Sequence, residues 1–174
     1  MKSNMQNNNI IKILKSDGIG ILPTDTLYGL VGSAFSKKAI KRIYAVKNRD
    51  KNKKLIVLIS SLKDLAKFKI NINKKQEEVL KKFWPGKVSV VLNNIAFRLP
   101  KNKNLIEILK KTGPLVAPSA NKEGMKPAKN IKEAKKYFSD EVDFYFAGGN
   151  LKSEPSTLIK INKMGEIKVL RGKL

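Results

Sequence analysis

Residues 22–30 bring together several polar groups that can do chemistry. Thr24, Asp25, Thr26 and Tyr28 stand within five residues and directly follow a short apolar stretch that is typical of a strand. Loops at strand ends, held by a rigid sheet, are where binding and catalytic groups tend to sit. The alternative interpretation is a capped turn, in which Thr and Asp side chains bond their own backbone.

A second candidate is the basic segment 47–55, which contains Lys47, Arg49 and Lys53. It lies between a predicted helix and a predicted buried strand. Its many N–H donors could grip a polyphosphate, because charge-assisted bonds to phosphate oxygens are strong. The alternative is a solvated basic loop, since charge runs usually face the solvent.

Three shorter polar segments lie further along the chain. Ser119 and Asn121 follow a buried apolar stretch, and these residue types either cap helices or donate to phosphate oxygens. Ser156 stands at the start of a predicted strand, and Arg171 lies near the C-terminus. A turn at a sheet edge explains either of the last two equally well.

The chain has no cysteine and no histidine. A cysteine nucleophile, a thiolate metal site and a histidine general base are therefore excluded. Any chemistry must run on Lys, Arg, Asp, Glu, Ser, Thr, Tyr and backbone groups.

The net charge of +23 has two interpretations. A strongly basic chain usually indicates nucleic acid or an anionic membrane as a partner. However, 33 of the 37 basic residues are lysine, and AT-rich codons encode Lys, Asn and Ile, so a genome-wide bias is the other source. Arginine is correspondingly scarce, and its planar fork binds phosphate or carboxylate in a way that lysine cannot. A specific role, one that lysine could not fill, is therefore a hypothesis for each of Arg42, Arg49, Arg98 and Arg171.

Hydrophobic periodicity predicts a single α/β domain over residues 1–174 with a mixed sheet. Helices are predicted over 8–16, 37–46, 62–68, 73–83, 105–111 and 131–138. Strands are predicted over 18–22, 55–59, 88–92, 96–99, 115–117, 144–147, 157–161 and 167–170. No apolar stretch approaches the roughly 18 residues of a membrane span, so we expect no membrane partner and a cytoplasmic location.

In this order and spacing the polar segments resemble the YrdC-like family of threonylcarbamoyl-AMP synthases, in its short single-domain form. The matching motifs are Pro23-Thr24-Asp25-Thr26-Leu27-Tyr28-Gly29-Leu30, Lys47-x-Arg49, Trp84-Pro85-Gly86, Arg98, Ser119-x-Asn121, Pro155-Ser156-Thr157 and Leu170-Arg171-Gly172. They cover the chain from about Gly18 to its end.

The resemblance implies an open, twisted α/β sheet with flanking helices around a deep basic cavity. Family members combine L-threonine, bicarbonate and ATP, with Mg²⁺, into threonylcarbamoyl-AMP and pyrophosphate. A separate transferase complex then passes the threonylcarbamoyl group to a tRNA adenosine beside the anticodon.

The resemblance also assigns residues to the two substrates. Threonine would lie against Thr26, Arg98, Ala117 and Ser156, with Arg98 on its carboxylate. ATP would be surrounded by Lys47, Arg49, Lys53, Ser119, Asn121 and Arg171, with Lys47 and Arg49 as the catalytic pair. Arg42, on a predicted helix, is expected to be an ordinary surface residue. No metal-ligating side chain is assigned.

The chain departs from the family pattern at three positions. Asp50 and Lys54 stand where prolines are common, and Leu58 stands where many members carry a histidine near the threonine. Asp50 could also form a competing ion pair with Arg49. Two alternatives to the synthase are an RNA-binding protein, supported by charge, and a nucleotide-binding paralogue without synthase activity. Weak RNA or tRNA binding could also accompany the enzyme.

Overall fold

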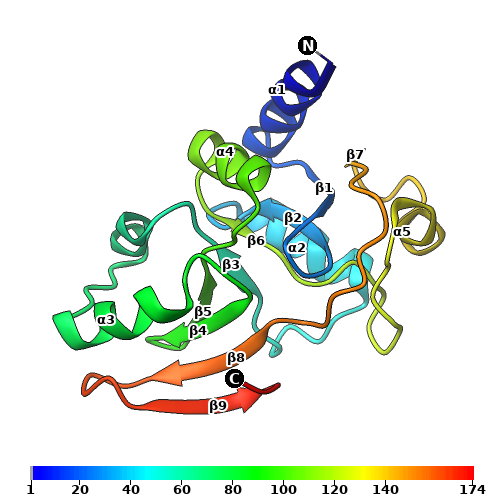
Figure 1. Ribbon diagram of the computed structural model, residues 1–174. Coiled ribbons are helices and arrows are strands. Elements are labelled where there is room, and N and C mark those ends of the chain that lie inside the picture. Colours follow the sequence, from blue (N-terminus) through cyan, green and yellow to red (C-terminus); the bar gives the residue numbers. More distant parts are fainter. Residues whose placement is uncertain (1) are drawn as a thin grey trace.

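The computed structural model describes residues 2–174, and the side chains from residue 6 onward. Within these residues the chain forms one open nine-stranded sheet with helices packed against it (Figure 1). The strands are β1 (Ile19–Pro23), β2 (Tyr28–Ser33), β3 (Ile56–Leu58), β4 (Val88–Leu92), β5 (Ile95–Arg98), β6 (Leu115–Val116), β7 (Phe144–Tyr145), β8 (Thr157–Ile161) and β9 (Ile167–Arg171). The helices are α1 (Lys2–Lys15), α2 (Lys37–Lys47), α3 (Lys74–Phe83), α4 (Lys103–Thr112), α5 (Ile131–Phe138) and the 3₁₀ helix η1 (Leu62–Phe68).

The strand order is β7-β1-β2-β6-β3-β5-β4-β8-β9, which makes neighbours of strands that are distant in sequence. The pairs β1–β7, β3–β5 and β4–β8 are parallel, and the other neighbours are antiparallel. The predicted α/β class with a mixed sheet is confirmed.

Alternation along the strands separates the core into two layers, because successive strand residues point to opposite faces. On β2, Leu30 packs in the cluster that includes residues of α2, α3 and α5, whereas Val31 packs in the cluster built with α1 and α4. Val57 and Leu58 of β3 divide in the same way. The helices α1 and α4, which lie together in Figure 1, therefore cover one face and the remaining helices cover the other.

Two local predictions rest on specific side chains and are confirmed. Ser36 caps α2, since its hydroxyl accepts the N–H of Ala39 at 3.0 Å. Asn93 and Asn94 join β4 to β5 with φ values of 44° and 65°. Positive φ at both central residues is the geometry of a two-residue type I′ hairpin, which asparagine tolerates.

The strand β2 is absent from the sequence-based prediction, because Gly29 and Gly32 interrupt its apolar pattern and glycine is depleted in strands. The structure gives a reason for Gly32. A Cβ there would lie 3.0 Å from Ile19 Cγ2 and 3.1 Å from Ala39 Cβ. The absence of a side chain at Gly32 thus lets helix α2 pack closely on the strand.

Two other elements differ from expectation. Helix α1 begins at Lys2 rather than at residue 8, so it extends into the polar, Asn-rich start of the chain. The segment 62–68 forms a 3₁₀ helix, which stops where Lys69 takes a left-handed conformation. The ends of the other predicted elements differ by at most two residues.

The expectation for Arg42 is wrong. Its guanidinium donates to both carboxylate oxygens of Asp143, at 2.7 and 3.1 Å, and to the Glu141 carbonyl. Asp143 also accepts the Ile19 N–H at 2.7 Å, and the Arg42 bond lowers the pKa of this carboxyl. The bidentate pair ties α2 to the segment before β7, which is a structural reason for an arginine.

Among residues 2–174, no helix has both the length and the apolar character needed to cross a membrane.

Candidate active site

A cavity of about 490 Å³ opens on the sheet face that α1 and α4 cover only in part. Gly29, Ile56 and Ala117 line it, and each lies on the same side of its strand as a residue packed against those helices. Small side chains at Gly29, Ala96 and Ala117 leave room where larger ones would fill the space. The volume falls within the roughly 300–1,000 Å³ of small-molecule sites.

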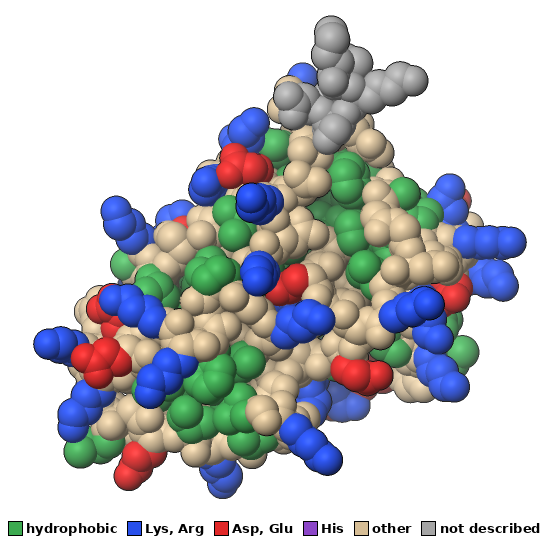
Figure 2. All heavy atoms as spheres, in the orientation of Figure 1, with side chains coloured by type: hydrophobic (Ala, Val, Ile, Leu, Met, Phe, Trp, Pro, Cys, Tyr) green, Lys and Arg blue, Asp and Glu red, His purple; other side chains and the backbone are tan. Residues whose placement is uncertain are grey.

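The residues that line this cavity carry charge of one sign. Arg49, Lys53, Lys54, Arg98 and Arg171 contribute five cations, and no carboxylate stands among the lining residues that the structure describes. On the face drawn in Figure 2, Lys and Arg side chains are scattered over the surface with acidic side chains among them. The cavity therefore favours an anionic ligand more specifically than the molecule's overall charge does.

Eight of the ten predicted site residues line the cavity, namely Thr26, Arg49, Lys53, Arg98, Ala117, Ser119, Ser156 and Arg171. They come from six separate stretches of sequence. Lys47 and Asn121 do not line it and lie behind the wall that Ser119 forms. The structure thus brings the segments together, and their roles toward substrates stay predictions.

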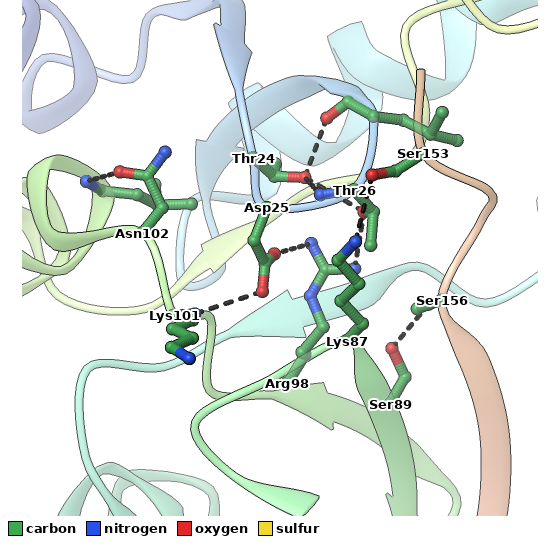
Figure 3. Close-up of polar contacts among 12 residues, drawn as sticks. Thr24, Asp25, Thr26, Lys87, Ser89, Arg98, Lys101, Asn102, Ser153 and Ser156 are labelled. Carbon is green, nitrogen blue, oxygen red and sulfur yellow. Dashed lines mark hydrogen bonds and ion pairs between the residues drawn. The ribbon is translucent and has the colours of Figure 1, made fainter. Parts of the chain in front are cut away.

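Arg98, at the end of β5, is 5% exposed and has two neighbours in the turn before β2 (Figure 3). Its Nη1 donates to Thr26 Oγ1 at 3.0 Å, and its Nη2 lies 3.1 Å from Asp25 Oδ1. Burial lowers the pKa of Arg98, and the Asp25 charge opposes this. The Nε atom is buried without a hydrogen-bond partner in the described structure.

Asp25 is a polar residue to which sequence reasoning gives no role. Its Oδ2 accepts the Lys101 N–H at 3.1 Å, so the carboxylate links the β1–β2 turn to the chain after β5 (Figure 3). The partners are separated in the sheet by β6 and β3. Only the strand order brings them together, and the sequence carries no signal for that order.

The turn itself is both a capped turn and a part of the site. Thr24 Oγ1 donates to the Leu27 carbonyl at 2.7 Å and accepts the Thr26 N–H at 3.1 Å. This arrangement leaves Thr26 Oγ1 directed at Arg98. The two interpretations of residues 22–30 are therefore compatible.

Ser156 and Arg171, which both line the cavity, are bonded to each other. Arg171 Nη2 donates to the Ser156 carbonyl at 3.0 Å, and Ser156 Oγ lies 2.9 Å from Ser89 Oγ. Ser89, on β4, is fully buried and is not among the predicted site residues. A serine inside a strand gives no sequence signal of this kind.

The basic segment 47–55 is folded back on itself rather than free. Arg49 donates from Nε to the Lys53 carbonyl at 3.2 Å and from Nη2 to the Lys54 carbonyl at 3.3 Å. The expected ion pair between Arg49 and Asp50 is absent among the described residues. Instead Glu123 binds the Lys53 ammonium and accepts the Asp50 N–H at 3.2 Å, and Lys53 lowers the pKa of Glu123.

Tyr28 is a further residue that sequence reasoning leaves without a role. Its buried hydroxyl donates to the Gly149 carbonyl and accepts the Gly148 N–H, both at 2.8 Å. A Cβ at Gly148 would lie 2.5 Å from Pro23, so the chain passes close to β1 here. Tyr28 thereby anchors the segment that leads to Ser156.

Leu58, at the position where the resemblance suggests a histidine, is fully buried in the apolar layer with α4 and does not line the cavity. The described side chains do not form a metal-binding group either. No group of three or more Asp or Glu residues suited to a metal occurs in the part of the chain that the structure describes.

A mixed α/β sheet with a basic cavity, lined also by hydroxyl groups, is suited to a small anionic ligand. The chain belongs to the Sua5/YciO/YrdC family, whose model, described as "Telomere recombination", matches residues 12–172.

Two relatives are named putative threonylcarbamoyl-AMP synthases. The one from Methanocaldococcus jannaschii is 29% identical over 167 residues, covering 88% of this chain and 79% of the relative. The one from Mycobacterium tuberculosis is 26% identical over 163 residues, covering 85% and 75%.

Solved structures show the same fold. The structure of P. abyssi Sua5 complexed with L-threonine is 24% identical with a TM-score of 0.88, covering 96% of this chain. The chain spans only 54% of that protein. E. coli YciO is 21% identical with a TM-score of 0.85, covering 96% of this chain and 88% of YciO.

Proposed function

We propose that this protein is a threonylcarbamoyl-AMP synthase, which joins L-threonine, bicarbonate and ATP into threonylcarbamoyl-AMP and pyrophosphate. The proposal rests on one observation: eight of the ten predicted residues line the same cavity. Its described walls carry five cations and no carboxylate. The names of the relatives and the L-threonine bound to P. abyssi Sua5 support it.

The chemistry suits a chain without histidine or cysteine. The threonine amine adds to bicarbonate with loss of water, or to CO₂ with loss of a proton, and gives a carbamate. A carbamate oxygen then attacks the α-phosphorus of ATP, and pyrophosphate leaves. No protein nucleophile takes part, so catalysis consists of holding two anions in line, which can lower a barrier by about 7–11 kcal/mol.

Threonine would bind at the end where Thr26, Arg98 and Ser156 meet. Asp25 and Thr26 hold the Arg98 guanidinium in one orientation. It would pair there with the carboxylate of threonine. The hydroxyls of Thr26 and Ser156 would bond the remaining polar groups of the amino acid. Ala117 would lie against it from the end of β6.

ATP would occupy the end lined by Arg49, Lys53, Ser119 and Arg171. Their cations would offset the charge that develops on the phosphates during transfer. Magnesium would enter with ATP and neutralise its phosphate oxygens, held mainly by them rather than by side chains.

The product would serve the modification of tRNA. We propose that a separate transferase complex takes up threonylcarbamoyl-AMP and modifies the adenosine beside the anticodon, in the cytoplasm where ATP, threonine and tRNA are all present. The acyl phosphate of the product is activated for such a transfer.

The test is pyrophosphate release from ATP, with threonine and bicarbonate each left out in turn. The proposal expects release only when both are present, and expects Arg49→Ala to lose activity by about a hundredfold, as removal of one charge-stabilising donor does. Lys82→Ala, on the exposed surface of α3, is the matched control and should retain activity. If no combination consumes ATP while the protein binds RNA tightly at physiological salt, the RNA-binding alternative replaces the synthase.

A further inference from the structure

Lys47, the last residue of α2, is a buried cation without an anionic partner. It is 1% exposed, and no ion pair among the described residues includes it. Its Nζ donates to the carbonyls of Ser119 and Asn121, each at 2.5 Å, and lies 3.5 Å from Asn121 Oδ1. An ammonium has three N–H donors, and the two carbonyls engage two of them while Asn121 Oδ1 lies at the long limit of a bond to the third.

The loop that receives these bonds is closed by its own side chains. Ser119 Oγ donates to Asn121 Oδ1 at 2.6 Å, and Asn121 Nδ2 donates to the carbonyls of Lys122 and Met125, both at 2.8 Å. The backbone also returns to the helix, since Glu123 N–H donates to the Lys47 carbonyl at 2.8 Å. Residues 119–125 and the end of α2 therefore form one hydrogen-bonded unit.

Of this unit, only Ser119 reaches the cavity. To touch a phosphate there, Lys47 would have to give up two short charge-assisted bonds and leave the Asn121 carbonyl without a donor, while the Ser119 carbonyl would keep only the Asn121 N–H at 3.0 Å. A buried polar group that loses its partner bears the full cost of its desolvation. The geometry thus opposes direct contact.

We propose that Lys47 is a positioning residue, which fixes the Ser119–Asn121 loop from behind the cavity wall and does not itself contact ATP. The proposal rests on the proposed function for the identity of the ligand, but the role of the lysine does not depend on it. Asn121 belongs to the same unit. In the Lys47-x-Arg49 pair, Arg49 then faces the cavity and Lys47 supports the wall from behind. In the Ser119-x-Asn121 pair, Ser119 faces the cavity and Asn121 supports it.

The surroundings of Lys47 agree with this role. Burial, followed by the nearby Arg49 charge, lowers the pKa of Lys47 to about 8, with Glu123 opposing and Lys122 adding to the shift. A lysine held ready for a polyanion would be expected near solvent, as Lys53 is.

The decisive measurement is hydrogen exchange of the backbone amides of residues 117–125 in the protein without added ligand. Lys47→Met is expected to speed this exchange by about tenfold or more, the effect of losing one good hydrogen bond. Lys54→Met is the matched control, because the Lys54 side chain lines the cavity but bonds only the Asn94 carbonyl, and it should leave the loop unchanged. If Lys47→Met leaves loop exchange as in wild type while ATP affinity falls, the lysine acts by direct contact and the proposal is overturned.

A wild-type measurement covers the case in which Lys47→Met does not fold. The Lys47 ¹⁵Nζ signal is expected at pH 7 without ligand, exchanging slowly with water because the group is buried. Addition of ATP and Mg²⁺ should leave its chemical shift in place and show no coupling to phosphorus. A coupling to ³¹P, or loss of the couplings to the loop carbonyls, would contradict the positioning role. Neither readout needs turnover, so failure of the synthase proposal would be visible separately, in the pyrophosphate assay.

Discussion

At the scale of the residue, Tyr28 makes the sharpest stability prediction. Tyr28→Phe removes one hydroxyl that both donates to Gly149 and accepts from Gly148. The Gly148 N–H is left without its acceptor, so we expect a loss of about 1–3 kcal/mol in the free energy of unfolding. Urea denaturation measures it, and Tyr137→Phe, which removes one exposed bond to the Lys126 carbonyl, should cost less. Equal losses of unfolding free energy in the two variants would show that the Tyr28 hydroxyl does not anchor the segment at Gly148 and Gly149.

Lys47 makes a prediction about pH. Its pKa is about 8 in the folded protein against an ordinary value of 10.5. Between these two pH values the unfolded chain binds more protons at Lys47 than the folded protein does. The contribution of Lys47 to the free energy of unfolding therefore rises with pH across this range. Wild type should therefore gain stability relative to Lys47→Met from about pH 8 to pH 10.5. Urea denaturation of both proteins at several pH values measures the gap, and a constant gap would mean that the pKa is not lowered.

At the scale of the element, Glu123 holds residues 50–54 against the 119–125 loop. Glu123→Gln removes the Lys53 ion pair and weakens the bond to the Asp50 N–H. Global stability should change little, because exposed ion pairs contribute weakly. The local effect should be larger, and tryptic cleavage after Lys51, Lys53 and Lys54 should become faster. Glu107→Gln, which breaks the exposed pair with Lys110 on α4, should leave these cleavage rates unchanged.

The small side chains of the central strands make a prediction about binding. Ala117→Leu would push a branched side chain into the cavity from the margin of the apolar layer that α1 and α4 cover. Affinity for threonine and ATP should fall by at least about tenfold, while stability stays within about 1 kcal/mol, as for a change outside the fully packed core. Calorimetric titration and thermal melting measure the two. Ala45→Leu, on the exposed side of α2, should change neither.

At the scale of the whole molecule, the sequence predicts well what depends on local chemistry. The Ser36 cap and the hairpin through Asn93 and Asn94 follow from side chains that act within a few residues. The cavity residues can be found because short motifs stand at strand ends, where the fold gathers them. Fold class follows from the alternation of helical and strand-like patterns.

What sequence reasoning misses depends on which strands become neighbours. The pair between Asp25 and Arg98 crosses two intervening strands, and the Arg42–Asp143 pair joins residues that are 101 positions apart. The strand β2 escapes prediction because its glycines fit packing partners that a linear pattern does not reveal. Whether Lys47 faces the cavity or its back likewise depends on where the Ser119 loop lies.

The row of like charges in the cavity has a practical consequence. Asp25 and Glu123 offset the charges of Arg98 and Lys53, but the other three lining cations have no carboxylate partner among the described residues. A polyanion that enters would relieve their mutual repulsion. Inorganic phosphate, sulfate and released pyrophosphate would therefore raise the melting temperature and compete with ATP. Buffers that contain such ions would raise the apparent stability of the protein and lower its apparent affinity for ATP. Measurements in solution should therefore use chloride salts and buffers without multivalent anions.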